Sequence, residues 1–100
     1  MKSQTTVLSI GLNDKDTKEQ IIDTDRARAI ISKIVSDCTM YNATGKYTHE
    51  DGTQVSEQCI RVELYDAPDN AIKVYCKKLK KQLNQECIAV SRYYTDVEFI

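Results

Sequence analysis

Hydrophobic and polar residues alternate most regularly between positions 55 and 66, and the predicted fold is built around this stretch. The apolar residues Ile60, Val62 and Leu64 recur at every second position, and the positions between them hold Glu57, Cys59, Arg61 and Glu63. Successive side chains of a strand point to opposite faces of a sheet, so this period predicts a half-buried strand. The polar Glu50-Asp51-Gly52 before it predicts the turn of a hairpin, because glycine readily adopts a positive φ.

Three further segments have the patterns of strands. Residues 5–12 are β-branched and apolar, with Leu8 and Ile10 on one face and Val7 and Ser9 on the other. Residues 38–47 predict the first arm of the hairpin, and Gly45 indicates a bulge or bend within it. Residues 86–100 predict the final strand, in which Ile88 and Val90 share a face.

Two other segments have a helical period. The first should begin after an N-cap at Asp23 or Thr24 and end near Asp37, and its apolar stripe comprises Ala27, Ile30, Ile31, Ile34 and Val35. The second should begin at Pro68-Asp69-Asn70 and end at Asn84-Gln85, with a stripe of Ile72, Cys76, Leu79 and Leu83. Residues 18–22 leave two alternatives open, a turn of helix or an extended crossing segment.

The resulting order, β-α-β-β-α-β, predicts one domain over residues 1–100. It predicts an α+β fold, a ferredoxin-like sandwich of a four-stranded antiparallel sheet with both helices on one face, since right-handed crossovers place them together. The opposite face of the sheet would then carry Val7, Ser9, Tyr41, Cys59 and Arg61. That mixed surface is where we expect a partner or a ligand to bind.

The net charge and the hydropathy of the chain limit the classes of partner that we expect it to bind. The 100 residues carry a formal net charge of -1, which argues against a general affinity for nucleic acid or for an acidic membrane. No apolar run approaches the roughly 18 residues of a membrane helix. Residues 1–4 lead directly into a strand rather than into the apolar core of a signal peptide. We therefore expect a cytoplasmic protein with neither nucleic acid nor membrane as its partner.

Four cysteines, Cys38, Cys59, Cys76 and Cys87, include no CxxC pair, and His49 is the single histidine. This set does not match a zinc site, and no metal or cofactor is predicted. Two disulfides in a secreted protein are one interpretation of an even count. Reduced, buried thiols are the favoured one, because each cysteine falls where an apolar or half-buried residue is expected.

Several short motifs resemble a family of small bacterial and phage domains of unknown function. The motifs are Ile10-Gly11-Leu12, then Gly45-Lys46-Tyr47 followed by Asp51-Gly52, Val55 and Glu57, and finally Gln85-Glu86-Cys87-Ile88, in which the family has serine in place of Cys87. The resemblance covers most of the chain and implies a ferredoxin-like fold without an established activity. It singles out Tyr47, Glu57, Gln85 and Glu86.

The candidate ligand-binding residues are Tyr47, Glu57, Arg61 and Tyr41. Tyr47 and Glu57 would meet across the hairpin, where the carboxylate would polarise the phenol or hold a ligand amine, or else the two would form a structural contact. Arg61 would bind a carboxylate or phosphate, or else form a cross-strand ion pair. We interpret His49, with Glu50 and Asp51, as part of a solvated turn, and the lysines of residues 77–81 as a solvated helix face.

The aromatic and apolar tail, residues 93–100, predicts an extended strand that packs on a second copy of the chain or across its own sheet. The first functional hypothesis is therefore a non-enzymatic binding protein with a small-molecule or protein partner. It would form a homo-oligomer through the open sheet face and the C-terminal strand. The alternatives are a cofactor-independent enzyme of the dimeric α+β-barrel type, and a phage-encoded binder of a nucleotide or of a host protein.

Overall fold

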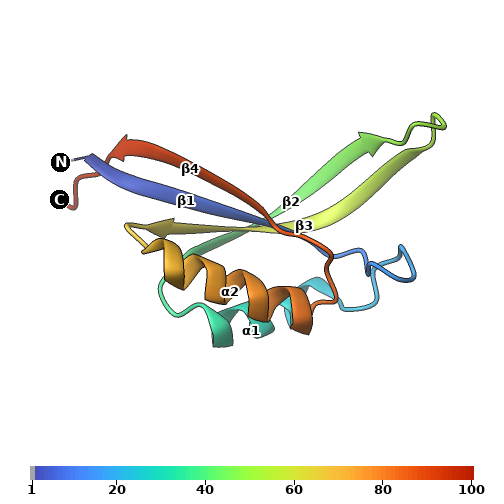
Figure 1. The fold of residues 1–100 in the computed structure, drawn as a ribbon, viewed down its shortest axis with the longest axis horizontal. Coiled ribbons are helices and arrows are strands. Elements are labelled where there is room, and N and C mark those ends of the chain that lie inside the picture. The colour runs from blue at the N-terminus through green and yellow to red at the C-terminus, as the bar shows by residue number, and fades with distance from the viewer. Residues whose placement is uncertain (1) are drawn as a thin grey trace.

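Both helices lie against one face of a single antiparallel sheet in the computed structural model, which describes residues 2–100 (Figure 1). The elements follow in the order β1 (Lys2–Gly11), α1 (Thr24–Ile34), β2 (Thr39–Thr48), β3 (Gln54–Tyr65), α2 (Asp69–Gln82) and β4 (Ala89–Asp96). The strands are arranged β2-β3-β1-β4 across the sheet. This arrangement confirms the predicted ferredoxin-like α+β fold. Met1, the first residue of the predicted domain, lies outside the described residues.

The core lies between the sheet and the helices. Leu8 pairs with Val62 and Ile10 with Ile60 across β1 and β3, and all four side chains are fully buried. Buried residues of the helices complete this layer, namely Ala27, Ile31, Ile72 and Leu79. The alternation in β3 therefore has the predicted register, with its apolar positions towards the helices.

The other face of the sheet, here called the outer face, carries the residues predicted for it. Arg61 pairs with Ser9 of β1 and with Tyr41 of β2, so the three side chains emerge on the same side. Thr5 and Thr95 share this face and are joined by a hydrogen bond of 2.7 Å between their hydroxyl oxygens.

Both helices begin at the predicted positions but end earlier than expected, α1 at Ile34 and α2 at Gln82. The carboxylate of Asp23 accepts a hydrogen bond from the Arg26 amide at 2.8 Å and so caps α1. The helix ends at Ile34, three residues before Asp37, because Val35 is extended at φ -112° and ψ 111°. The Val35 side chain nevertheless lies in the core, so the apolar stripe continues past the end of α1. Residues 18–22 form no helix, and Gln20 pairs with Asn13 in an isolated bridge.

Two expectations about the strands were wrong. Pairing between β2 and β3 runs through Gly45, which lies opposite Glu57, so the strand has no bulge there. The last strand occupies only Ala89–Asp96, and the four residues after it leave the sheet. Lys2, where β1 begins, pairs with Asp96, the last residue of β4. Phe99 instead contacts Tyr65 edge to face, with ring centroids 6.4 Å apart.

The hairpin of β2 and β3 extends well past the helices (Figure 1). Its turn contains Gly52 at φ +87°, the positive value expected from the sequence. The Gly52 amide donates to the His49 carbonyl at 2.9 Å, and the Asp51 carboxylate accepts from the Thr53 amide at 2.8 Å. This projecting end brings part of the hairpin beside the loops at the end of β1.

All four cysteines are free thiols. Burial raises the pKa of the Cys38 and Cys76 thiols, which keeps them protonated. Cys87 is exposed, so the expectation of burial is wrong for this residue, which lies in the irregular connection before β4. Among the described residues, no helix combines the length and the apolar character needed to span a bilayer.

Candidate functional site

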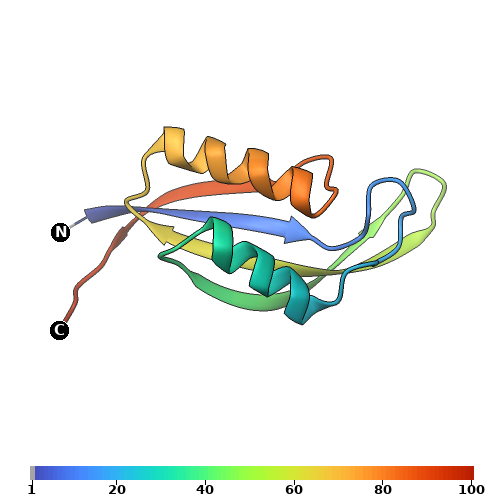
Figure 2. The ribbon, with the colours of Figure 1, turned by 90° about the horizontal axis from the view of Figure 1, so that it is seen from below.

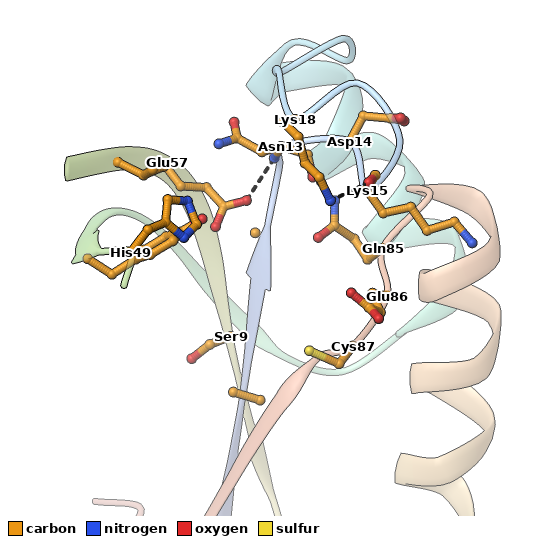
Figure 3. Close-up of a pocket in the computed structure, with 14 residues that line it drawn as sticks. Ser9, Asn13, Asp14, Lys15, Lys18, His49, Glu57, Gln85, Glu86 and Cys87 are labelled. Carbon is orange, nitrogen blue, oxygen red and sulfur yellow. Dashed lines mark hydrogen bonds between the residues drawn. The ribbon is translucent and has the colours of Figure 1, made fainter. Parts of the chain in front are cut away.

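A cleft of about 450 Å³ opens beside the projecting hairpin, at the end of β1 (Figure 3). Three segments surround it: the hairpin, the loop that follows β1, and the connection from α2 to β4. The lining residues are Ser9, Gly11, Asn13, Asp14, Lys15, Lys18, Tyr47, His49, Val55, Glu57, Gln85, Glu86, Cys87 and Ala89. The volume lies within the ordinary range for a small-molecule site.

Glu57 is held in place by the backbone of β1 and the residues after it. Its Oε2 accepts a hydrogen bond from the Asn13 amide at 2.9 Å. The carboxylate lies directly over Gly11, where a Cβ would come within 2.5 Å of Oε2 and 2.7 Å of Oε1. Only glycine leaves room for the carboxylate at this point of β1. The Ile10-Gly11-Leu12 motif thus has a structural reason, which the sequence pattern did not reveal.

Asn84 joins the loop after β1 to the end of α2. Nδ2 of Asn84 donates to both carboxylate oxygens of Asp14, at 2.5 and 2.8 Å, and to Asp16 at 2.9 Å. The Lys15 amide donates to the Asn84 carbonyl at 3.1 Å. Hydrogen bonding from Asn84 lowers the pKa of the Asp14 carboxyl below its ordinary value, because it favours the charged form. We call this cluster of Asp14, Asp16 and Asn84 the loop clasp.

Gln85 continues from the loop clasp into the cleft. Its Nε2 donates to the Asn13 carbonyl at 2.8 Å and to the Leu83 carbonyl at 3.3 Å. Both side-chain donors are thus directed at the protein, while its amide oxygen remains available to a ligand. Gln85 faces Glu57 across the cleft, and Glu86 and Cys87 follow along the same wall (Figure 3). Gln85 and Glu86, which the family resemblance singled out, therefore lie in the same cleft as Tyr47 and Glu57.

The hairpin contributes an aromatic pair to the cleft. Tyr47 and His49 pack edge to face, with ring centroids 5.4 Å apart. His49 is exposed, as its interpretation as a turn residue requires, but it also lines the cleft. Tyr47 lies opposite Val55 and Glu57 opposite Gly45, and no hydrogen bond among residues 2–100 joins Tyr47 to Glu57. Their relation is a shared cleft rather than a direct pair.

Lys15 and Lys18 stand at the loop side of the cleft and were not selected by any sequence motif. Both are exposed, and Nζ of Lys18 donates to the Lys15 carbonyl at 2.7 Å. Lys18 adopts a positive φ of 65°, which is unusual for a residue other than glycine. The turn that brings these lysines to the cleft is irregular, so no periodic pattern could have predicted it.

The other two candidates, Tyr41 and Arg61, lie outside the cleft. Nε of Arg61 donates to the Tyr41 hydroxyl at 3.2 Å, and that hydroxyl donates to Glu63 Oε1 at 3.2 Å. The three side chains form a cross-strand network through the tyrosine, in place of the ion pair weighed from the sequence. In the part of the chain that the structure describes, no group of three or more His, Cys, Asp or Glu residues is placed to hold a metal ion.

Two solved structures share this fold over nearly their whole length. One is a phage SAM lyase in complex with S-methyl-5'-thioadenosine, which matches with a TM-score of 0.63 and 19% identity over 98% of this chain and 92% of the other. The second is a phage SAM lyase in its apo state, with a TM-score of 0.54 and 18% identity over 99% and 93% of the two chains. No protein-family model and no curated protein sequence matches the chain.

Proposed function

We propose that this protein is a lyase that cleaves S-adenosylmethionine in the cleft beside Glu57 and releases S-methyl-5'-thioadenosine. The observation that carries this proposal is the fold shared, nearly end to end, with a lyase bound to that compound. Among the hypotheses from the sequence, this supports a cofactor-independent enzyme over a purely non-enzymatic binding protein. The cleft supports it independently, because its side chains complement the parts of the substrate.

S-adenosylmethionine joins an adenosine to a positively charged sulfonium and an amino-acid chain. The aromatic pair of Tyr47 and His49 offers a surface on which adenine stacks. Oxygen atoms of Gln85 and Glu86 accept hydrogen bonds from ribose hydroxyls. The carboxylate of Glu57, held over Gly11, attracts the sulfonium.

In the proposed reaction, the bond between the sulfur and Cγ of the amino-acid chain breaks. The sulfur keeps the electron pair and becomes a neutral thioether, while an oxygen of the substrate's own carboxylate bonds to Cγ. The four-carbon fragment then leaves as a lactone, so the step balances without water and without a proton transfer. The step neutralises one positive and one negative charge of the substrate. Glu57 attracts the charged substrate but not the neutral thioether, which helps the product to leave.

Incubation of the purified protein with S-adenosylmethionine, followed by chromatographic measurement of S-methyl-5'-thioadenosine, tests the proposal. We expect Glu57→Gln to lower kcat/KM by about 100-fold, mainly through a higher KM, because it removes the attraction for the sulfonium and keeps the shape. Arg61→Ala, outside the cleft, should retain activity within about threefold. Calorimetry with S-methyl-5'-thioadenosine should give nearly equal affinities for the wild type and Glu57→Gln.

The proposal fails if the wild type forms no more S-methyl-5'-thioadenosine than buffer alone. Equal losses in Glu57→Gln and Arg61→Ala would place the reaction somewhere other than this cleft.

The proposal also includes assembly of the chain into a homo-oligomer through the outer face and the C-terminal segment. Support comes from exposed aromatic side chains on the outer face and in the C-terminal segment, including Tyr93 at 44% exposure, Tyr65 at 48% and Phe99 at 84%. Monomers rarely leave a large apolar patch uncovered. Size-exclusion chromatography with light scattering decides the matter, and a monomer at micromolar concentration would contradict it.

A further inference from the structure

The charges of this protein are separated between its two layers. Helices α1 and α2 carry eight of the fourteen Lys and Arg residues but only two of the fifteen Asp and Glu residues. Those two acids, Asp25 and Asp69, stand in the first turns of their helices. The helix layer is therefore strongly positive and the rest of the chain strongly negative, although the net charge is only -1. A helix face needs polar side chains to be soluble, but it does not need one sign of charge.

A groove of about 560 Å³ lies between the two helices, which are side by side on the sheet (Figure 2). Four exposed cations line it: Arg26 and Lys33 from α1, and Lys78 and Lys81 from α2. Its lining includes no acidic residue. Within residues 2–100, none of these four side chains takes part in an ion pair or a hydrogen bond, and the ion pair that is present joins Arg92 to Asp69.

The groove is also apolar in part. Ile30 and Ile34 line it and are half-buried, because each also packs against the core. Cationic side chains on both helices therefore flank two isoleucines. Phosphate groups of a nucleic acid would use the cations but gain nothing from the isoleucines, and the acidic remainder of the molecule would repel a long polyanion.

We propose that this groove binds an amphipathic acidic helix of a partner protein. The leucines or isoleucines of such a helix would lie over Ile30 and Ile34, and its glutamates or aspartates would face the cations on both sides. This is the helix-in-groove mode of recognition, with charge setting the orientation and the partner class. The inference does not depend on the proposed lyase activity, because none of these residues lines the cleft beside Glu57.

A fluorescein-labelled helical peptide of about 16 residues is a suitable probe, with leucines at i, i+4, i+7 and i+11 and glutamates on both flanks. Fluorescence anisotropy should show saturable binding. Lys78→Glu with Lys81→Glu should weaken it at least about tenfold. The matched control, Lys73→Glu with Lys77→Glu, makes the same charge change on the same helix outside the groove, and should keep the affinity within about twofold. A peptide with its leucines changed to serine should bind more weakly.

Thermal melts of both double variants test whether each is folded, which we expect because all four lysines are exposed. Absence of saturable binding, or equal weakening by the two double variants, would overturn the proposal, because the attraction would then be general. A single-stranded oligonucleotide that binds more tightly than the peptide and depends on Lys78 and Lys81 would assign the groove to nucleic acid instead. A change in oligomeric state caused by the groove variant alone would assign it to a second copy of this chain.

Discussion

At the scale of single residues, the position of Glu57 depends on Gly11, because a side chain at position 11 would occupy the space of the Glu57 carboxylate. Glycine at position 11 leaves the volume that the Glu57 carboxylate occupies, and the Asn13 amide then holds that carboxylate. Asn84 holds the neighbouring loop in a similar way, because its side-chain amide donates to the carboxylates of both Asp14 and Asp16. Gly11, Asn13 and Asn84 thus set the positions of the polar groups of the cleft.

Substitution of Gly11 by alanine should therefore damage activity more than stability. The new Cβ would displace the end of a flexible side chain, so we expect the melting temperature to change by less than about 5 °C. Loss of the Glu57 position should lower kcat/KM by at least about tenfold. Gly45→Ala is the matched control, because its Cβ would lie 3.9 Å from the Glu57 carbonyl oxygen, an ordinary contact. Wild-type turnover in Gly11→Ala would show that the observed position of Glu57 is not needed.

Because of the hydrogen bonds in the loop clasp, we expect the protein to become less stable at acidic pH. The pKa of Asp14 lies below its ordinary value of 3.8 in the folded protein, so the unfolded chain binds its proton more readily. The stabilisation is thus present above pH 3.8 and is lost as the pH falls through the lower folded value. Thermal melts at several pH values should show Asp14→Asn less stable than the wild type near neutrality, with the two converging in acid. A difference that is independent of pH would contradict this assignment.

At the scale of the elements, β3 connects the core to the cleft. Ile60, Val62 and Leu64 anchor it beneath the helices, and Glu57 lies on the same strand where the hairpin projects beyond them. Because β2 and β3 pair without interruption along the hairpin, Tyr47 of β2 lies in the same cleft as Glu57 of β3. An error of one residue in this register would exchange the core face for the outer face.

Two adjacent substitutions in β3 should therefore have opposite consequences. Val62→Asp would place an unpaired charge at a fully buried position, at a cost of several kcal/mol, which is enough to unfold a domain of this size. Arg61→Ala would lose a hydrogen bond to Tyr41 on the outer face and create no core cavity, so we expect a loss below about 1 kcal/mol. Thermal unfolding of the two variants measures the difference. If Arg61→Ala unfolded the protein and Val62→Asp did not, the register would be wrong.

At the scale of the whole molecule, two functions are proposed for two different regions. The cleft lies between the projecting hairpin, the loop after β1 and the connection from α2 to β4, whereas the groove lies between α1 and α2 (Figures 2 and 3). The positive helix layer opposite an acidic remainder gives the molecule a strong polarity that its net charge conceals. High salt should therefore weaken binding at the groove, because exposed charges are screened over about 10 Å at moderate ionic strength.

The sequence by itself determined the order of elements, the buried face of β3 and both helix starts, because these depend on local periodicity and capping. The tertiary structure decided where strands and helices stop: α1 ends at Ile34 and β4 at Asp96, although the apolar patterns continue. It also decided the cleft, which combines residues such as Asn13, Glu57 and Gln85 from distant parts of the chain. Hydrogen bonds across 44 and 72 positions leave no periodic trace in a sequence, so only the folded chain reveals them.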